Sequence, residues 1–255
     1  MTPPFPSADK ALTDKVAVVT GGSSGIGAAC VRLLAESGAS VVIGFNRGEE
    51  RAETLRSTLP GQGHRTLQMP LTDGAAHGEM ARQLKDAFGH VDILVNSAGF
   101  TQRIAHADLE SLDAALFNEI LVANAGGPFS ITRALMPLLR SAGDAVVVNV
   151  SSVSAFTGLG SNIAYCAAKA ALDNMTMSLA RAFGPGIRFL SVSPASVDTD
   201  FVQGRNRAEL EKKAALTPLG RIVTPEDVAL SVLACVTHLR TATGTRIVID
   251  GGHSL

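Results

Sequence analysis

The sequence predicts one α/β domain built on a doubly wound parallel sheet of seven strands, with helices on both faces. Short β-branched runs alternate strictly with segments of helical periodicity from Lys15 onward, which is the pattern of parallel strands joined by helices. The 255 residues are 46% apolar and 18% charged, enough to bury a large core without disulfides or a metal. No repeat, low-complexity stretch or linker divides the chain, so residues 15–255 are expected to form a single domain.

The first half of the chain carries four of the predicted strands. The first strand, Val16–Val19, is apolar throughout, as expected for a central parallel strand covered on both faces. The helix that follows, Gly25–Ser37, ends before Gly38, the residue type that most readily closes a helix. The alternation then predicts, in order, the strand Ser40–Phe45, the helix Glu49–Leu59, the strand Arg65–Met69, the helix Asp73–Phe88 and the strand Val91–Val95.

The second half continues the same alternation. Two helical segments lie between Leu109 and Arg140, and a long helix at Ile163–Phe183 ends at a Gly-Pro pair. The last helix, Pro225–His238, has Thr224 as its N-cap and proline at its first position. The remaining strands are predicted at Ala145–Val150, Ile187–Val192 and Arg246–Ile249. In such sheets ligands bind beyond the carboxyl ends of the strands, near the point where the strand order reverses.

Composition excludes several classes of partner. Lys and Arg number 22 against 23 Asp and Glu, a net charge of −1, so we expect no nucleic-acid or anionic-membrane partner. The apolar runs are too short to cross a bilayer. The 3 cysteines lack CxxC spacing and no two histidines lie four residues apart, so we expect a reducing, cytoplasmic compartment and no metal site. Residues 1–14 contain prolines but no basic segment before an apolar one, and are expected to form a flexible leader rather than a signal peptide.

A glycine-rich segment, Thr20–Gly27, joins the first strand to the first helix. Gly21, Gly25 and Gly27 permit a tight turn in which backbone N–H groups approach a pyrophosphate at the helix N-terminus. Such glycines also suit a merely flexible turn, but their place at the first strand–helix junction favours a dinucleotide site.

The end of the second strand bears on which dinucleotide is bound. An NAD site would place an acidic residue there to accept hydrogen bonds from the ribose 2′-hydroxyl. The chain instead reads Asn46-Arg47 before Gly48, and a guanidinium suits a 2′-phosphate. Arg47 could also be an ordinary exposed loop residue. The preference for NADP therefore depends as much on the missing acid as on the presence of Arg47. We therefore expect NADP(H) in preference to NAD(H).

Tyr165, Lys169 and Ser152 form the most informative set of polar residues. Tyr165 and Lys169 lie four residues apart on one predicted helix, so they share a face, and Ser152 lies just beyond a strand. A free tyrosine has a pKa of about 10, too high for efficient proton transfer at neutral pH, and an adjacent ammonium lowers it. Ser152 is then placed to hold a substrate oxygen while Tyr165 transfers the proton. A surface Tyr–Lys pair is the simpler explanation of the spacing alone, but the three features at one sheet edge favour catalysis.

With these motifs the chain resembles the short-chain dehydrogenase/reductase family from Lys15 to Gly252, which implies a Rossmann-type fold. Residues 20–27 match the pattern TGxxxGxG, residues 96–99 match NNAG with one change, and Tyr165–Lys169 matches YxxxK. Ser152 precedes Tyr165 by 13 residues, the family's usual spacing. Residues 194–199 match PGxVxT with one change, and the segments 220–227 and 249–252 resemble the tetrameric reductases of the family, including 3-oxoacyl thioester reductases.

The resemblance implies a role for each matching residue. Tyr165 would be the general acid/base, Ser152 would polarise the carbonyl, and Lys169 would bind the nicotinamide ribose and lower the tyrosine pKa. Asn124 would hold a water in a proton relay that reaches Lys169. The residues expected to contact the cofactor, besides Tyr165 and Lys169, are Gly21, Ser23, Ser24, Gly25, Ile26, Gly27, Asn46, Arg47, Leu71, Asn96, Ala98, Gly99, Pro194, Val197 and Thr199.

The chain departs from the family pattern at three places. Pro70 stands where the family often has an aspartate for the adenine, so that contact is left to the Leu71 backbone. Ala195 replaces a glycine, which requires a negative φ. Residues 184–186 lack the basic residue that carrier-protein reductases tend to have, which weakens an acyl-carrier-protein interpretation without excluding coenzyme A thioesters or free ketones.

The segment around residues 199–219 lies where the family keeps its substrate lid. From Phe201 to Leu219 it carries an excess of two positive charges, with Arg205, Arg207, Lys212 and Lys213 against Glu209 and Glu211. These charges would attract an anionic substrate or simply belong to a solvated helix, and we favour the solvated helix. Phe100, Phe156 and Leu159 would line an apolar pocket or serve as ordinary packing. The helix that carries Tyr165 is apolar or small on nearly all sides, which predicts a homo-oligomer, a tetramer by resemblance.

These observations predict an NADP(H)-dependent oxidoreductase that interconverts a ketone and a secondary alcohol. A 3-oxoacyl or ketone reductase is the first interpretation, and a polyol, sugar or steroid-type alcohol dehydrogenase is the alternative. A non-catalytic dinucleotide-sensing regulator is a third, which the catalytic set argues against because a sensor needs no proton donor.

Overall fold

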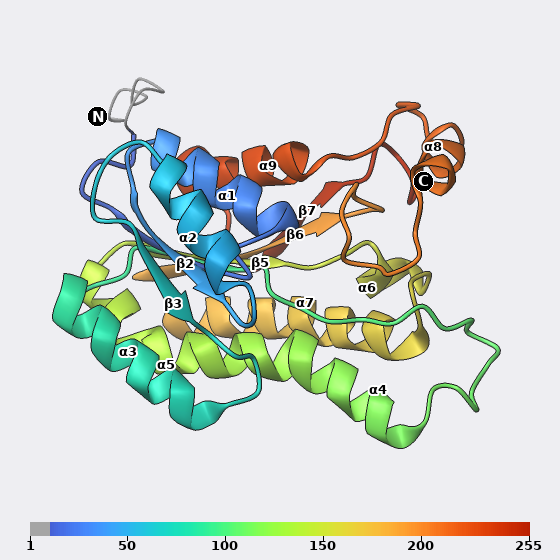
Figure 1. The fold of residues 1–255 in the computed structure, drawn as a ribbon, viewed down its shortest axis with the longest axis horizontal. Coiled ribbons are helices and arrows are strands. Elements are labelled where there is room, and N and C mark those ends of the chain that lie inside the picture. The colour runs from blue at the N-terminus through green and yellow to red at the C-terminus, as the bar shows by residue number, and fades with distance from the viewer. Residues whose placement is uncertain (1–10) are drawn as a thin grey trace.

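One seven-stranded parallel sheet organises residues 11–255, the part of the chain that the computed structural model describes (Figure 1). The strand order is β3-β2-β1-β4-β5-β6-β7. The strands are β1 (Val16–Thr20), β2 (Ser40–Phe45), β3 (Arg65–Gln68), β4 (Ile93–Asn96), β5 (Ala145–Val150), β6 (Ile187–Pro194) and β7 (Thr245–Ile249). The predicted fold class is therefore confirmed.

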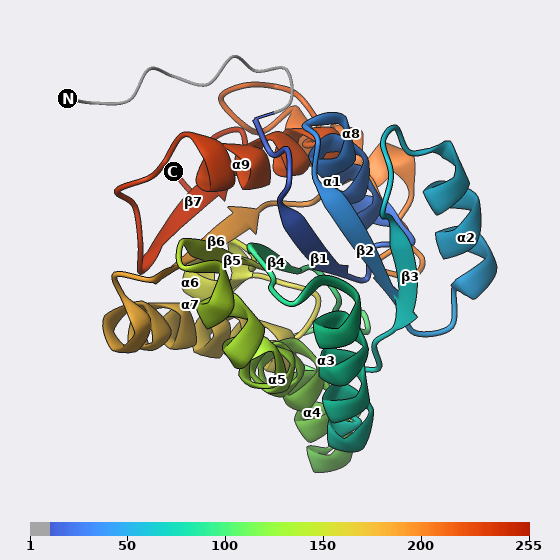
Figure 2. The ribbon, with the colours of Figure 1, turned by 90° about the vertical axis from the view of Figure 1, so that its left-hand side faces the viewer.

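Helices cover both faces of the sheet (Figure 2). One face is covered by α1 (Gly25–Glu36), α2 (Glu49–Thr58) and α9 (Pro225–Thr237). The other face is covered by α3 (Gly74–Phe88), α4 (Ala114–Leu121), α5 (Gly127–Ala142) and α7 (Ile163–Phe183), with a π-helical segment, η1 (Val122–Gly126), between α4 and α5. Two short helices, α6 (Ser154–Thr157) and α8 (Arg207–Ala214), follow β5 and β6. Within residues 11–255, no helix combines the length and apolar character that crossing a membrane requires.

The central strands are buried on both faces, as their continuous apolar runs predict. All five residues of β1 are buried, and alternate residues enter different halves of the core. Val18 joins the cluster beneath α3 and α5, whereas Ala17 and Val19 join the cluster beneath α1 and α9. The register places Val18 beside Val42 on one side and Leu94 on the other, which fixes the carboxyl ends of the strands relative to one another.

The boundaries of the predicted elements follow the sequence closely. The helix Ile163–Phe183 and the strands Ser40–Phe45 and Ala145–Val150 have the predicted bounds. The predicted strand Val91–Val95 instead occupies Ile93–Asn96. Helix α8 lies in the segment where we expected a solvated helix, and it buries only Leu210 and Ala214. Helix α6 was not predicted, because its four residues are too few to show apolar periodicity.

The predicted flexible leader is packed where the structure describes it. Residues 1–10 lie outside the described residues, and residues 11–14 form a turn. Leu12 is 5% exposed and joins the core cluster beneath α1 and α9, and its N–H donates to the Ser37 oxygen at 2.9 Å. The expectation of a flexible leader is thus wrong for residues 11–14, because Leu12 adds an apolar side chain to the core.

Candidate active site

The strand order reverses between β1 and β4, and the predicted site residues lie at that point. The chain leaves β1 for β2 and β3, then returns to the other side of β1 as β4. Thr20 and Asn96, at the carboxyl ends of β1 and β4, are register partners. The Thr20 hydroxyl oxygen accepts hydrogen bonds from the N–H groups of Ser97 and Ala98, both at 3.0 Å. These bonds hold the loop after β4 against the turn after β1, where ligands bind in sheets of this topology.

The glycine-rich turn is packed too closely for any side chain at its key positions. Gly21 and Gly25 have φ values of 64° and 50°, which favour glycine. A Cβ at Gly27 would lie 2.2 Å from the Gly21 oxygen, and a Cβ at Gly21 would lie 3.0 Å from the Ala98 Cα. The first turn of α1 is therefore in direct contact with the preceding turn, as a backbone cradle for a phosphate requires.

The N-terminus of α1 has no side-chain cap. Ser24 occupies the N-cap position in an extended conformation, yet its side chain makes no capping bond, and the first turn holds no acidic residue. The first N–H groups of the helix, from Gly25 to Gly27, therefore receive no capping side chain. The Thr199 Cγ2 lies 3.3 Å from the point where a Cβ of Gly25 would stand, so the lid segment begins beside these amides. Uncapped amides at a tight glycine turn fit the pyrophosphate of a dinucleotide.

The carboxyl end of β2 presents two arginines and no acid at the predicted ribose position. Asn46 and Arg47 are exposed, and the Asn46 oxygen accepts a bond from the Gln68 side chain at 3.1 Å. Arg51, which we did not predict, reaches back to the turn: a Cβ at Gly48 would lie 2.7 Å from its Nη2 and 2.9 Å from the Ser23 hydroxyl oxygen. The spacing of Arg47 and Arg51, four residues apart, was the available signal for this second cation.

Leu71 is held at the adenine end of the expected cofactor path. It is half-buried, and its backbone oxygen lies 2.9 Å from the point where a Cβ of Gly127 would stand. The N-terminus of α5 therefore fixes the Leu71 backbone, the part of this residue that we expect to contact adenine.

Ser152, Tyr165 and Lys169 come together as the motif spacing predicts. The Lys169 Nζ lies 5.5 Å from the centre of the Tyr165 ring and donates a hydrogen bond to the Val150 oxygen at 2.7 Å. The Ser152 hydroxyl is hydrogen-bonded to the phenol of Tyr165. Asn162 caps α7 by accepting a bond from the Tyr165 N–H at 2.7 Å. The helix cap, the strand end and the lysine thus fix the phenol from three directions.

Burial shifts the pKa values of both Tyr165 and Lys169. Burial raises the pKa of Tyr165 above its ordinary value, and the hydrogen bond from Ser152 and the charge of Arg205 oppose that rise. Burial lowers the pKa of Lys169 to about 8, opposed by the charge of Asp173. At neutral pH Tyr165 is therefore a neutral phenol and most of Lys169 is protonated, so the site holds a proton donor beside a cation.

Asn124 lies within the π-helical segment, Val122–Gly126, and is fully buried. Its side-chain nitrogen donates to the Phe100 oxygen at 2.6 Å and to the Ile120 oxygen at 2.9 Å. Its side-chain oxygen has no partner and lies 2.6 Å from the point where a Cβ of Gly99 would stand. An inserted residue in a helix commonly marks a functional position, and here it leaves a buried acceptor free for a hydrogen-bond donor.

Asn96 belongs to a buried row of polar side chains that crosses the sheet. Its side-chain nitrogen donates to Asn149 at 2.9 Å and to Thr132 at 3.2 Å. Asn149 in turn donates to Thr176 at 2.8 Å, and the hydroxyls of Thr176 and Ser191 are hydrogen-bonded at 3.1 Å. The Asn96 side-chain nitrogen is therefore engaged in fixing β4, β5, β6 and α7, whereas its side-chain oxygen has no partner and, with the backbone, is left for the predicted cofactor contact.

The loop after β6 brings the remaining predicted residues to the crevice. Pro194 ends β6, and Val197 forms an isolated parallel bridge with Val223. Thr199, as described above, stands over Gly25. Among the described residues other than glycine, only one has a positive φ and it lies outside this loop, so the φ of Ala195 is negative as its methyl group requires.

Three further side chains act on this set. Sequence reasoning gave no role to Ser154 and Phe201, and it counted Arg205 among the lid cations that would attract an anionic substrate or belong to a solvated helix. The Ser154 hydroxyl is hydrogen-bonded to the Ser152 hydroxyl at 3.1 Å, which orients the latter. The Phe201 ring lies 6.0 Å from the Tyr165 ring, and the positive charge of Arg205 lowers the Tyr165 pKa. Phe201 and Arg205 come from the lid, which is distant in sequence, and no local pattern marks their approach to the phenol.

The predicted apolar lining is only partly brought to the site. Phe100 contacts Asn124 through its backbone oxygen. Phe156 is 41% exposed, with the guanidinium of Arg246 4.8 Å from its ring centre, and Leu159 is 65% exposed. Phe156 therefore packs against a cation instead of closing a pocket around Ser152.

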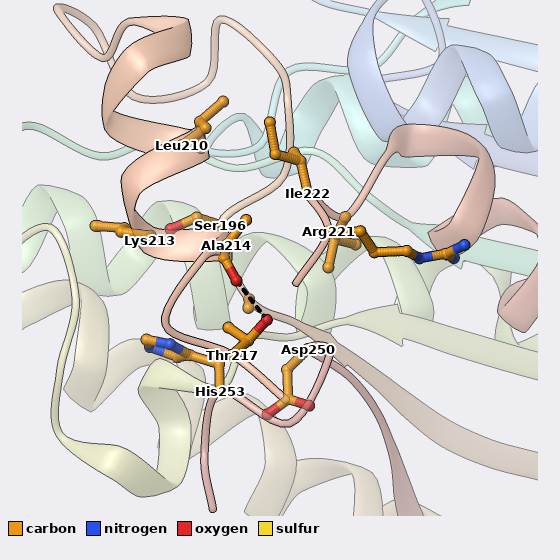
Figure 3. A pocket seen from close by; sticks show the side chains of 11 residues that line it. Ser196, Leu210, Lys213, Ala214, Thr217, Arg221, Ile222, Asp250 and His253 are labelled. Atoms are coloured by element: carbon orange, nitrogen blue, oxygen red, sulfur yellow. Dashed lines mark hydrogen bonds between the residues drawn. The ribbon is translucent and has the colours of Figure 1, made fainter. Parts of the chain in front are cut away.

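A separate small pocket, with a cavity volume of about 20 Å³, lies between α8 and the C-terminal segment (Figure 3). Leu210, Lys213, Thr217, Arg221 and Asp250 are among its lining residues. The Thr217 hydroxyl donates to the Ala214 oxygen at 2.8 Å across the end of the helix. None of Ser152, Tyr165 and Lys169 lines this pocket, so it is distinct from the catalytic set.

Comparison with known proteins places the whole chain among oxidoreductases. Residues 21–254 match the family model described as "Enoyl-(Acyl carrier protein) reductase". The chain is 35% identical over 242 residues to "Granaticin polyketide synthase putative ketoacyl reductase 2" of Streptomyces violaceoruber, covering 94% of this chain and 96% of that protein. It is 34% identical over 249 residues to the cis-4-hydroxycyclohexanecarboxylate dehydrogenase of Sinomonas cyclohexanicum, covering 96% and 98%.

Solved structures agree with these sequence matches. A short-chain dehydrogenase from Burkholderia cenocepacia in complex with NADP superimposes with a TM-score of 0.86 at 31% identity, covering 96% of this chain and 99% of that one. The family match, residues 21–254, includes the glycine-rich turn from Gly21, the three residues Ser152, Tyr165 and Lys169, and the segment 199–219. The chain is therefore an oxidoreductase that belongs to the short-chain dehydrogenase/reductase family.

Proposed function

We propose that the protein catalyses the NADP(H)-dependent interconversion of a ketone and a secondary alcohol. The observation that carries this proposal is the Ser152–Tyr165 hydrogen bond, which lies beside a buried lysine at the switch point of the sheet. Two hydroxyl groups this close converge on one point, so each can turn its proton to a carbonyl oxygen when that oxygen replaces the bond between them. No role in sensing a dinucleotide would need this arrangement.

The chain's own residues account for the proton transfer. Ser152 donates a hydrogen bond to the carbonyl oxygen and polarises it, while Ser154 orients the Ser152 hydroxyl. Tyr165, held neutral by burial, gives its proton to the same oxygen as the alcohol forms. Lys169 lies beside the ring with its ammonium fixed on the Val150 oxygen, so its charge favours the phenolate that remains. A nicotinamide, when bound, supplies or accepts the hydride.

NADP(H) is the proposed dinucleotide because of the charges after β2. Arg47 and Arg51 provide two guanidinium groups for a 2′-phosphate, and no carboxylate stands at the strand end to hold the ribose hydroxyls of NAD. The uncapped N-terminus of α1 would receive the pyrophosphate, and the free Asn124 oxygen is placed to accept a hydrogen bond from a water in the proton path.

Two substrate classes are supported by different relatives. The ketoacyl reductase from Streptomyces supports a 3-oxoacyl or ketone reductase. Relatives named as a hydroxycyclohexanecarboxylate dehydrogenase, a 3alpha-hydroxysteroid dehydrogenase and a D-threitol dehydrogenase support an alcohol dehydrogenase with a cyclic or polyol substrate. All share one reacting group, a secondary alcohol or its ketone.

The test of the proposed function is direct. Purified protein is mixed with NADPH or NADH and a panel of 3-oxoacyl esters, free ketones and sugars, and oxidation of the dinucleotide is followed by absorbance. Turnover of at least one carbonyl, faster with NADPH than with NADH, is expected. Tight dinucleotide binding without turnover of any carbonyl would identify a sensor instead.

We further propose that the protein is a homotetramer. Phe129 of α5, Val122 beside it, and Ile163 and Met177 of α7 are between 37% and 47% exposed. Large apolar side chains grouped on exposed helix faces are typical of surfaces that a second subunit covers. Light scattering during size exclusion measures the assembly, and a monomer would contradict this proposal.

A further inference from the structure

Arg205 is a lid residue whose charge lies beside the catalytic phenol. It follows Phe201, whose ring stands 6.0 Å from the Tyr165 ring at an angle of 53°. The Arg205 N–H donates to the Val202 oxygen at 3.3 Å, which closes the turn and holds the residue on the same short segment. The turn that carries Arg205 therefore begins at the ring that packs beside the phenol, and the charge of Arg205 acts on that phenol.

The guanidinium of Arg205 has no anionic partner among the described residues, whereas its neighbours do. Arg207, two positions along, is ion-paired with Asp198 at 2.6 Å and with Glu211 at 3.1 Å. Arg103 is ion-paired with the nearby Glu209 at 3.0 Å. Arg205 itself is only partly exposed, and burial lowers its pKa. A partly buried charge without a counter-ion is unfavourable and gains most from a bound anion.

A second unpaired cation strengthens the local positive charge. Lys213, on α8, forms no ion pair within residues 11–255, and the charges of Arg205 and Arg103 lower its pKa along with burial. Glu209 is the one acid that acts on both Arg205 and Lys213, and it is already bonded to Arg103. Three cations therefore share one carboxylate at the inner side of the lid.

We propose that Arg205 binds a carboxylate of the substrate, so that the ketone and alcohol are an oxo acid and a hydroxy acid. The inference rests on the proposed function and names its substrate class. Guanidinium groups recognise carboxylates through paired, planar hydrogen bonds. Because Arg205 lies on the turn whose Phe201 ring packs beside Tyr165, the carboxylate belongs to the same small molecule as the reacting carbonyl. The phosphates of a coenzyme A thioester would lie at the far end of the pantetheine arm, away from the phenol.

The test compares acids with their neutral esters. Levulinate, acetoacetate and an oxocyclohexanecarboxylate, each beside its methyl ester, and a 3-oxoacyl coenzyme A thioester are offered with NADPH to the wild-type protein. The kcat/KM for an acid is expected to exceed that for its ester by about tenfold or more, the fold-change of one charge-assisted hydrogen bond. In Arg205→Gln this acid-to-ester ratio is expected to fall by about 10- to 100-fold. Arg205→Lys, which keeps the charge, should restore part of the preference.

Arg207→Gln is the matched control, because Arg207 lies on the same lid but is already paired with two carboxylates. It is expected to leave the acid-to-ester ratio within about twofold of the wild type. Equal turnover of acids and esters, an acid preference that survives in Arg205→Gln, or turnover of the thioester or neutral ketones without turnover of acids would each overturn the inference while leaving the proposed function intact. Absence of turnover with every carbonyl would overturn both.

Discussion

Replacing Gly27 by alanine should damage dinucleotide binding more than any other single methyl group in the chain. The added Cβ would lie 2.2 Å from the Gly21 oxygen and 2.7 Å from the Gly21 carbon, both backbone atoms that cannot rotate away. Real Cβ contacts are essentially never below 3.0 Å, so the turn after β1 must move by about 0.8 Å. Overpacking of this kind costs about 1–3 kcal/mol of folding free energy.

The larger effect is expected on binding. The shift displaces the N–H groups that we expect to hold the pyrophosphate, and each charge-assisted hydrogen bond lost costs about 1.5–3 kcal/mol. The dissociation constant for NADPH, measured by calorimetry, should therefore rise about 10- to 100-fold, with a Tm lower by several degrees.

Gly78→Ala is the matched control for the same chemical change. Gly78 lies inside α3, and a Cβ there would meet no atom within 4 Å. Alanine in a helix interior is favoured over glycine by about 0.5–1 kcal/mol, so this variant should be slightly more stable and bind NADPH normally. A Gly27→Ala protein that binds NADPH as tightly as the wild type would refute the cradle assigned to this turn.

Two further predictions concern charge. Arg47→Asp places a carboxylate where the 2′-phosphate is expected, so the ratio of kcat/KM for NADPH over NADH should fall about tenfold or more. Arg56→Asp, on the helix α2 that follows Arg47, should leave this ratio unchanged. An unchanged ratio in Arg47→Asp would contradict the preference for NADP. Burial lowers the pKa of Lys169 from 10.5 to about 8, so between these pH values the unfolded chain binds more protons and the free energy of unfolding rises with pH. In Lys169→Met the free energy of unfolding should rise less with pH. Urea unfolding at several pH values between 8 and 10.5 measures this rise. An equal rise in both proteins would contradict the lowered pKa of Lys169.

The sheet and the catalytic pair were accessible from sequence because both depend on local spacing. The apolar runs of β1 and β5 mark central strands, and Tyr165 and Lys169 share a helix face whatever surrounds them. The glycines of the turn after β1 could also be predicted from the sequence, because a backbone that approaches another backbone this closely requires glycine.

The features that sequence reasoning missed depend on contacts between distant segments. Arg103 and Glu209, which are 106 residues apart, form the ion pair that leaves Arg205 without a partner. The π-helical position of Asn124 depends on how α4 joins α5, which no residue preference specifies. Helix α8 begins at the Asn206 cap and buries Leu210 and Ala214, two small contacts that depend on how the lid segment packs against the rest of the chain.

The most direct test of the central claim is the single-turnover rate of carbonyl reduction in Tyr165→Phe. The substitution removes one hydroxyl and keeps the ring that packs near Phe201, so folding and NADPH binding should be preserved. If Tyr165 is the proton donor, the rate should fall about 100- to 10,000-fold while the dissociation constant for NADPH stays within about twofold. A rate within tenfold of the wild type would contradict the assignment of Tyr165 as the general acid.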